Sequence, residues 1–209
     1  TAASAATTVT ITITGTNDAP VLNTAATPVG VTVLEDAGAP VGAVGTLVSA
    51  LVDFNPPSGG LNNVTDADNG AVTGIAITAT DSANGTWWYS VNGGASWSAV
   101  GAVTDDTARL LASDSNTRVY FQANPDYDGQ ATLTFRAWDQ TSGTNGGTAD
   151  TTPAGGSSAY STSTDSAVFD ITPVIDGTVN ITAISSDSGS SSTDFLTNDT
   201  SLTVSGTNG

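Results

Sequence analysis

The chain has 209 residues, with 20 acidic side chains against three arginines, a net charge of −17, and no lysine, histidine, cysteine or methionine. This charge argues against nucleic acid and anionic membrane surfaces as partners. Without histidine and cysteine, imidazole proton shuttles and the usual nucleophilic triads are excluded, and an all-oxygen ligand set favours calcium over zinc.

The remaining composition indicates an extracellular β protein. Thr, Val, Gly, Ser and Ala dominate, no segment has a helical apolar period, and no run of 18 apolar residues could insert in a membrane. Missing cysteines fit either a cytosolic protein or a secreted one held together by metal instead of disulfides, and the Asp-rich, Lys-free composition favours the second. With neither an initiator Met nor a signal peptide, we expect a monomeric module from a longer chain.

The first expected strand covers residues 9–14, where Val and Ile alternate with Thr, and we interpret it as the end of a preceding module. It leads into Asn17-Asp18-Ala19-Pro20. This tetrapeptide resembles the linker between cadherin-like repeats, in which the Asn and Asp bind calcium. The alternative is a plain linker that ends in proline.

Acidic residues then follow two short apolar segments. The strand expected at residues 29–33 is followed by Glu35 and Asp36, and Asp53 stands in a later loop. Asp66 and Asp68 stand at i and i+2 before a glycine, so one turn could wrap a cation. The missing glutamate and flanking helices exclude an EF-hand, and a metal-free Asx turn is the alternative.

A strand at residues 75–79 precedes an aromatic hairpin whose turn is Asn92-Gly93-Gly94. Trp87, Tyr89 and Val91 share one face of its first strand, and Trp88 and Ser90 share the other. One face is expected to fill the core. An exposed Trp on the other could stack on a sugar ring or be covered by a loop.

Two alternating segments, residues 119–123 and 131–137, are expected to pair as a hairpin around the loop Asn124–Gln130. Asp126, Asp128 and Asp139 stand at the ends of these strands and either share a cation or are solvated turn residues. The long segment 140–164, which contains Asp150, is expected to be a mobile flap or a functional loop before a closing strand at 167–171.

The order of motifs in residues 28–175 resembles the cadherin-like, peptide-binding modules of giant bacterial RTX adhesins, as found in ice-binding and biofilm adhesins. The resemblance rests on Leu-Glu-Asp, Gly-Thr-Trp-x-Tyr-Ser and Asn-Pro-Asp-Tyr-Asp-Gly-x-Ala-Thr-Leu-Thr-Phe-Arg-Ala-Trp-Asp. From Val179 the chain is similar to the start of a bacterial Ig-like extender repeat. The Asp-rich nonapeptides of the RTX secretion region are missing from this sequence, so export by that route is implied by the resemblance alone.

We therefore expect an all-β chain with an antiparallel, calcium-stabilised cadherin-like sandwich at residues 21–175. Residues 1–20 would be the last strand and linker of a preceding module, and residues 176–209 a linker and the start of the extender repeat. The expected function is non-enzymatic, because two Asp in one tight loop more often share a cation than cleave a glycoside. The resemblance implies calcium-dependent binding of a protein C-terminus at a bacterial cell surface, and the alternatives are a carbohydrate-binding module and a spacer rigidified by calcium.

The candidate residues follow from these patterns. Several Ca²⁺ ions are expected, with ligands among Asn17, Asp18, Glu35, Asp36, Asp53, Asp66, Asp68, Asp126, Asp128 and Asp139. Contacts to the bound peptide, or to a glycan in the alternative, are expected from Trp88, Asp126, Tyr127, Asp128 and Asp150.

Overall fold

The computed structural model describes residues 8, 10–11, 15–52, 61–174, 179–184 and 203–208. Strands make up 36% of the structure and helix 4%, so the expectation of a nearly all-β chain is confirmed. The chain divides into two units, Thr1–Pro173 and Val174–Gly209. Each unit is described by itself.

The larger sheet of the first unit has six strands in the order β11-β8-β5-β10-β12-β2. At its centre, β10 pairs antiparallel with β5 on one side and β12 on the other, while β2 is added parallel to β12 at one edge. The strands are β2 (Val33–Leu34), β5 (Gly74–Thr80), β8 (Ala108–Ala112), β10 (Gly129–Trp138), β11 (Thr148–Ala149) and β12 (Asp165–Thr172).

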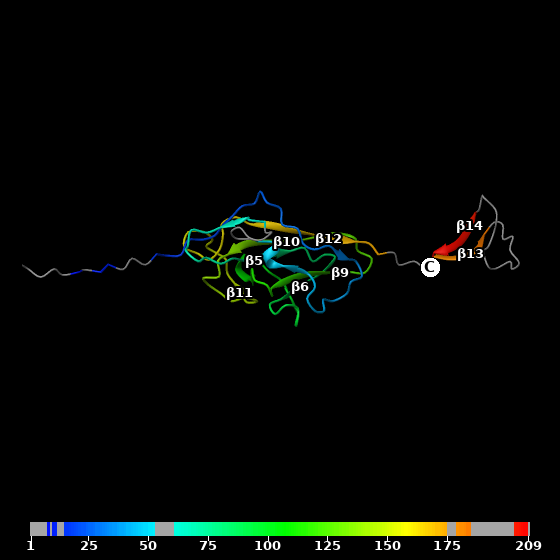
Figure 1. The fold of residues 1–209 in the computed structure, drawn as a ribbon, viewed down its shortest axis with the longest axis horizontal. Coiled ribbons are helices and arrows are strands. Elements are labelled where there is room, and N and C mark those ends of the chain that lie inside the picture. Colours follow the sequence, from blue (N-terminus) through cyan, green and yellow to red (C-terminus); the bar gives the residue numbers. More distant parts are fainter. Residues whose placement is uncertain are drawn as a thin grey trace, which may run out of the picture. The chain divides into compact units, whose positions relative to one another are not determined.

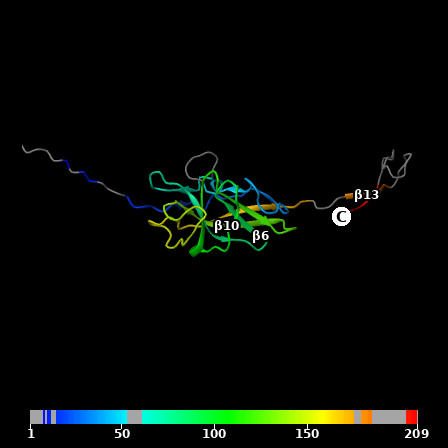
Figure 2. The same cartoon turned by 90° about the horizontal axis from the view of Figure 1, so that it is seen from below.

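A four-stranded sheet in the order β3-β9-β6-β7 forms the second layer, and β10, β12 and β5 lie on the opposite side of the core from β6 and β9 (Figures 1 and 2). Its strands are β3 (Thr46–Leu47), β6 (Gly85–Ser90), β7 (Ser98–Ala99) and β9 (Arg118–Ala123). A small separate pair joins β1 (Val21–Leu22) to β4 (Val64–Thr65), and two 3-10 turns lie at η1 (Val48–Ala50) and η2 (Asp105–Thr107).

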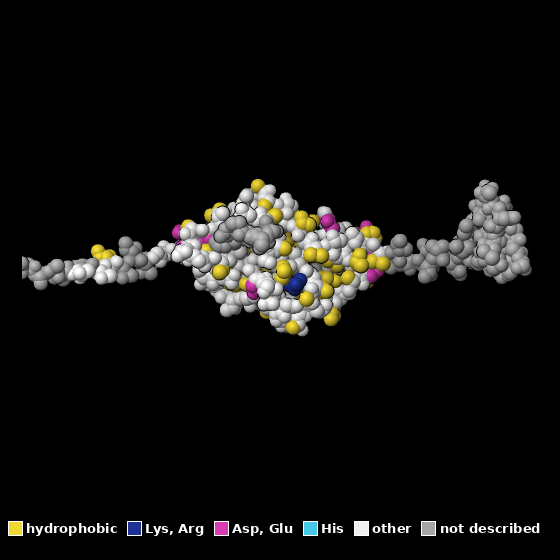
Figure 3. Space-filling view, viewed as in Figure 1, with side chains coloured by type: hydrophobic (Ala, Val, Ile, Leu, Met, Phe, Trp, Pro, Cys, Tyr) yellow, Lys and Arg dark blue, Asp and Glu magenta, His cyan; other side chains and the backbone are white. Residues whose placement is uncertain are grey.

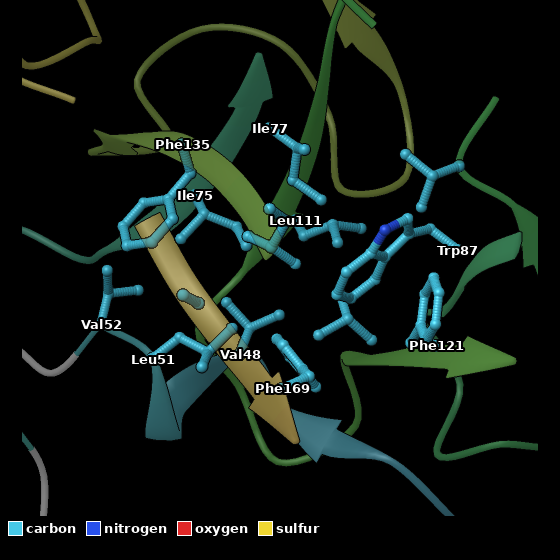
Figure 4. Packing of buried hydrophobic residues seen from close by; sticks show 14 of the residues in the cluster. Val48, Leu51, Val52, Ile75, Ile77, Trp87, Leu111, Phe121, Phe135 and Phe169 are labelled. Atoms are coloured by element: carbon cyan, nitrogen blue, oxygen red, sulfur yellow. The ribbon is translucent and has the colours of Figure 1, made fainter. Parts of the chain in front are cut away.

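The core lies between the two sheets and is built by the alternation seen in the sequence. Along β10 the side chains of Ala131, Leu133, Phe135 and Ala137 are buried, and the intervening ones are more exposed. Trp87 from β6 crosses to the other sheet, with its ring 4.8 Å from Phe169 and 5.0 Å from Phe121 (Figure 4). Phe169 belongs to β12 in the larger sheet, so its contact with Trp87 joins the two sheets, whereas Phe121 in β9 is the register partner of Trp87 within the smaller sheet.

The expected hairpin of residues 119–137 is wrong. β9 pairs with β3 and β6 in the smaller sheet, whereas β10 pairs with β5 and β12 in the larger one. The loop between them therefore crosses from one sheet to the other. The physical reason is that each strand has one apolar face. When β9 and β10 lie in opposite sheets, both apolar faces are buried in the same core, so the two strands need not pair with each other.

The segment 140–164 is a packed part of the unit. Ala159 and Tyr160 are buried against Trp138, and Thr151 and Ser161 of the same segment are also buried. Its backbone is tied to the sheet by hydrogen bonds such as Ser161 N–H to the Ala137 carbonyl at 3.0 Å. Of the two expectations for this segment, a mobile flap and a functional loop, the packing disfavours the mobile flap.

The second unit contains an antiparallel pair, β13 (Val179–Ile184) and β14 (Val204–Asn208). The strand expected at residues 9–14 lies mostly outside the described residues, as does Asp53. In the described part of the chain, none of the helical segments has the length and apolar character needed to cross a bilayer.

Candidate functional site

Five of the expected metal ligands meet at the end of the sandwich where the N-terminal segment enters. We call them the N-terminal acidic cluster: Asn17, Asp18, Asp66, Asp68 and Asp139. Pairing of β1 with β4 aligns Val21 with Thr65 and so brings the segment before β1 beside the loop after β4. Asp139 directly follows β10. Figure 3 shows acidic side chains mainly toward the two ends of the sandwich.

Hydrogen bonds join the members of this cluster. Asn17 Nδ2 donates to Asp139 Oδ2 at 2.8 Å and to the Ser158 carbonyl at 3.1 Å. The Asp18 amide donates to Asp68 Oδ2 at 2.9 Å, and the Asp68 amide donates to Asp66 Oδ1 at 2.8 Å. Each of these donors is a neutral amide. Among the described residues the one ion pair is Arg136–Asp105, so no arginine neutralises the cluster there.

Burial and mutual repulsion make this arrangement of charges costly. Burial raises the pKa of Asp66 above its ordinary value, and the charges of Asp68, Asp139 and Asp18 raise it further, although the hydrogen bond from the Asp68 amide opposes them. Asp66 Oδ2 is buried without a hydrogen-bond partner. Asp139 is only 2% exposed. A cation would offset both the desolvation and the repulsion.

Asp139 is also held by its own loop. Its Oδ1 accepts from the Thr141 amide at 2.8 Å and from the Thr141 hydroxyl at 2.6 Å. With Oδ2 bound by Asn17, the carboxylate is oriented from two sides. Asp139 therefore has the fixed geometry of a ligand or of an anchor for the segment that holds Asn17.

A hollow of 590 Å³ lies beside the cluster, between the N-terminal segment and two loops. Asp18 and Asp66 bring carboxylates to it, and the Gly156 backbone brings the long 140–164 segment. The Ala19 amide donates to the Gly156 carbonyl at 2.8 Å, which fixes that wall. The full lining is Asp18, Ala19, Val21, Thr65, Asp66, Ala67 and Gly156.

The residues present fit calcium in chemistry, since they supply carboxylate, amide and carbonyl oxygens. In the described part of the chain, however, no three acidic side chains converge closely enough to enclose a metal ion by themselves. A cation would therefore need oxygens other than carboxylates, such as the Asn17 amide, backbone carbonyls and water, to complete six to eight ligands.

Asp126 and Asp128 lie at the opposite end of the sandwich. Asp126 and Asp128 precede the ten residues of β10 and Asp139 follows them, so at about 3.3 Å per residue Asp128 and Asp139 are about 35 Å apart. The expected grouping of these three acids is therefore wrong. Sequence proximity to one strand suggested it, but a strand holds its two ends apart.

Glu35 and Asp36 belong to the same end as Asp128. β2 and β10 both pair with β12, and Ile171 is the partner of Val33 and of Gly129. The Glu35 amide donates to the Thr172 carbonyl at 3.1 Å, and the Glu35 side chain is 6% exposed. We call Glu35, Asp36, Asp126 and Asp128 the C-terminal acidic group.

Three expected ligand contacts have local partners. The Tyr127 hydroxyl donates to the Gln130 carbonyl at 2.8 Å, and its ring packs against the core. Asp150 is exposed, and its pKa is lowered by hydrogen bonds from the Thr152 hydroxyl and amide. Trp88 is partly buried, with its indole nitrogen donating to Gln122 Oε1 at 3.1 Å. None of these bonds joins the N-terminal acidic cluster.

Sequence reasoning missed Thr141, Gly156 and Ser158 as parts of the site. The Asp139-x-Thr141 spacing is a local turn signal that could have identified Thr141. Gly156 and Ser158 have no such signal, because they reach the cluster only through the fold.

Comparison with protein-family models, with curated proteins and with solved structures finds no match for this chain.

Proposed function

We propose that this chain is a calcium-dependent binding module of a secreted bacterial cell-surface adhesin, with a cadherin-like sandwich that captures the C-terminal carboxylate of a partner protein. The observation that carries the proposal is the buried, unpartnered Oδ2 of Asp66 among the carboxylates of the N-terminal acidic cluster. The sequence resemblance supports the adhesin class, and the hollow beside the cluster supports binding over a purely spacing role.

The N-terminal acidic cluster would hold the cation. Asp66 and Asp18 face the hollow, while Asn17 and Asp139 lock the N-terminal segment onto the end of β10. Bound calcium would supply positive charge and open coordination positions. It would thereby let a surface of net charge −17 accept an anionic peptide terminus.

The 140–164 segment would form a wall of the binding site. Gly156 lines the hollow, and Ser158 accepts a hydrogen bond from Asn17, so the loop and the N-terminal segment are coupled. The C-terminal acidic group would hold a further ion at the opposite end, where the chain leaves the sandwich. This second ion would stiffen the chain without contributing to the ligand site.

Calcium should stabilise the fold by a measurable amount. Extracellular sites bind calcium with dissociation constants on the order of 0.1–1 mM. At a hundredfold excess one ion contributes about 2.7 kcal/mol. With about 2–4 °C per kcal/mol for a unit of this size, the melting temperature should rise by about 5–11 °C. A melting temperature that chelator leaves unchanged would contradict the proposed site.

The ligand is tested with a library of peptides that have free C-termini, each paired with its amidated form, in calcium and in chelator. We expect binding only by the free acid and only in calcium. Asp66→Asn should weaken both calcium and peptide binding, while Asp106→Asn, an exposed acid outside the cluster, should change neither. Amidated peptides that bind as tightly as free acids would refute the carboxylate mechanism, and no peptide binding at all would favour the spacer.

A further inference from the structure

Three aromatic side chains lie on the outer face of the four-stranded sheet, which we call the aromatic face: Trp88, Trp97 and Tyr120. Trp88 in β6 is the register partner of Tyr120 in β9, so both side chains point to the same face. Trp97 just precedes β7, and its ring is edge-on to Tyr120 with 6.1 Å between centroids. Trp87, the neighbour of Trp88, points the other way and is buried in the core.

The polar atoms of these rings are already used within the protein. Trp88 Nε1 donates to Gln122 Oε1 at 3.1 Å, and Trp97 Nε1 donates to the Gly42 carbonyl at 3.2 Å. The Tyr120 hydroxyl donates to the Gly38 carbonyl at 3.2 Å. The indoles are therefore fixed in orientation, and what they offer to a ligand is ring surface.

A hollow of 340 Å³ opens between the two indoles and two neighbouring turns. One turn contains Gly42 and the other Gly94, and they approach so closely that a Cβ on Gly94 would overlap the Gly42 carbonyl. The two turns therefore touch at this point. The lining is Ala39, Pro40, Val41, Gly42, Trp88, Gly94, Ala95, Ser96 and Trp97.

The charge of the hollow selects its ligand. No charged side chain lines it, in a chain whose net charge is −17. An anionic ligand would meet long-range repulsion without a local cation, and a cationic ligand would find no carboxylate to pair with. An uncharged ligand avoids both costs.

A sugar ring matches the surface that remains. One face of a pyranose carries C–H groups, which pack on an indole, and its rim carries hydroxyls. Ser96 Oγ accepts from Asn92 Nδ2 at 2.8 Å, which leaves its hydrogen free to donate to such a hydroxyl. A proline-rich peptide also packs on aromatic rings, but both indole N–H groups are engaged, so its row of carbonyls would find the Ser96 hydroxyl as the one remaining side-chain donor of the lining, whereas a sugar hydroxyl can both accept from Ser96 and donate to a neighbouring group.

We propose that the hollow between Trp88, Trp97 and the turn at residues 39–42 binds a pyranose ring of an uncharged glycan. This site is separate from the N-terminal acidic cluster, so the chain would carry two independent recognition sites. Experiments on the same chain can therefore show separately whether the glycan site fails and whether the peptide site fails.

The experiment titrates the calcium-saturated chain with cellohexaose, maltohexaose, mannohexaose and galactohexaose while tryptophan fluorescence and heat of binding are recorded. We expect at least one to bind, and Trp97→Ala or Trp88→Ala to weaken it by about tenfold or more. Trp97→Phe should retain part of the affinity because it keeps a ring. Asp66→Asn should leave sugar binding unchanged. Far-UV circular dichroism and the melting temperature show that each variant is folded.

Three outcomes would overturn the proposal. The first is that none of the four oligosaccharides binds to the folded chain. The second is that one binds but is unaffected by both alanine substitutions. The third is that decaproline, titrated in parallel, binds at the indoles and displaces the sugar, which would make the hollow a peptide site.

Discussion

Replacement of Trp87 by alanine tests how the two sheets are held together. Trp87 is 2% exposed, lies against Phe121 and Phe169, and donates its indole N–H to the Asp81 carbonyl at 2.7 Å. Loss of a buried tryptophan costs about 3–5 kcal/mol. The upper part of this range is expected here, because the substitution removes both ring contacts and also the hydrogen bond to the Asp81 carbonyl.

Urea unfolding followed by far-UV circular dichroism measures the effect without relying on tryptophan emission. With a slope near 2 kcal/mol per molar urea, the midpoint should fall by about 2 M at constant slope. Trp87→Phe should cost about 1–2 kcal/mol, because it keeps a ring and loses the hydrogen bond. Trp88→Ala is the matched control and should cost about 1 kcal/mol or less, since Trp88 is on the outer face. Equal losses for the two alanine variants would refute the assignment of faces.

Two further predictions concern charged groups away from both proposed sites. Burial raises the pKa of Asp165 above its ordinary value near 3.8, and its Oδ2 has no hydrogen-bond partner. The folded chain therefore binds the proton of Asp165 more tightly than the unfolded chain does. The stability that this proton contributes is fully present below the ordinary pKa near 3.8 and is lost as pH rises through the raised pKa of the folded chain. Asp165→Asn should accordingly gain stability over the wild type at about pH 7 and much less at about pH 4, whereas a pH-independent difference would contradict the shift. Arg136 binds Asp105 Oδ1 through Nε and Nη2, both at 3.0 Å, and its Nη1 donates to the Ser161 carbonyl at 3.1 Å. Lysine cannot make all of these bonds, so Arg136→Lys should lower the free energy of unfolding by about 1–2 kcal/mol and speed limited proteolysis in segment 140–164. Asp105→Asn should have the smaller effect on proteolysis, because the arginine still holds the loop.

Local patterns identified the longer strands, whereas the strand expected at residues 29–33 is reduced to an isolated bridge at Val29 and the two residues of β2. The alternation at residues 131–137 predicted β10, and the strands expected at residues 75–79, 119–123 and 167–171 correspond to β5, β9 and β12. The separation of Trp87 from Trp88 into core and surface also follows from a two-residue period. These features depend on neighbours along the chain, so the sequence contains their full cause.

The pairing of strands required the tertiary structure. β9 and β10 are adjacent in sequence with a short loop between them, which is typical of a hairpin, yet they belong to different sheets. The pairing depends on which arrangement buries all apolar faces at once. The total apolar surface buried depends on all the strands from Val33 to Thr172, so it cannot be read from any one segment of the sequence.

The sequence by itself determined that this is an acidic β chain with oxygen ligands in its turns and no His- or Cys-based chemistry. Only the fold decided which acids meet. Asn17 and Asp139 are 122 residues apart and hydrogen-bonded, while Asp128 and Asp139 are separated by the length of β10. An extended strand keeps its ends apart, and the β1–β4 pair joins distant segments at one end of the sandwich. For this reason the ligand types could be predicted from composition, whereas their grouping into a site could not.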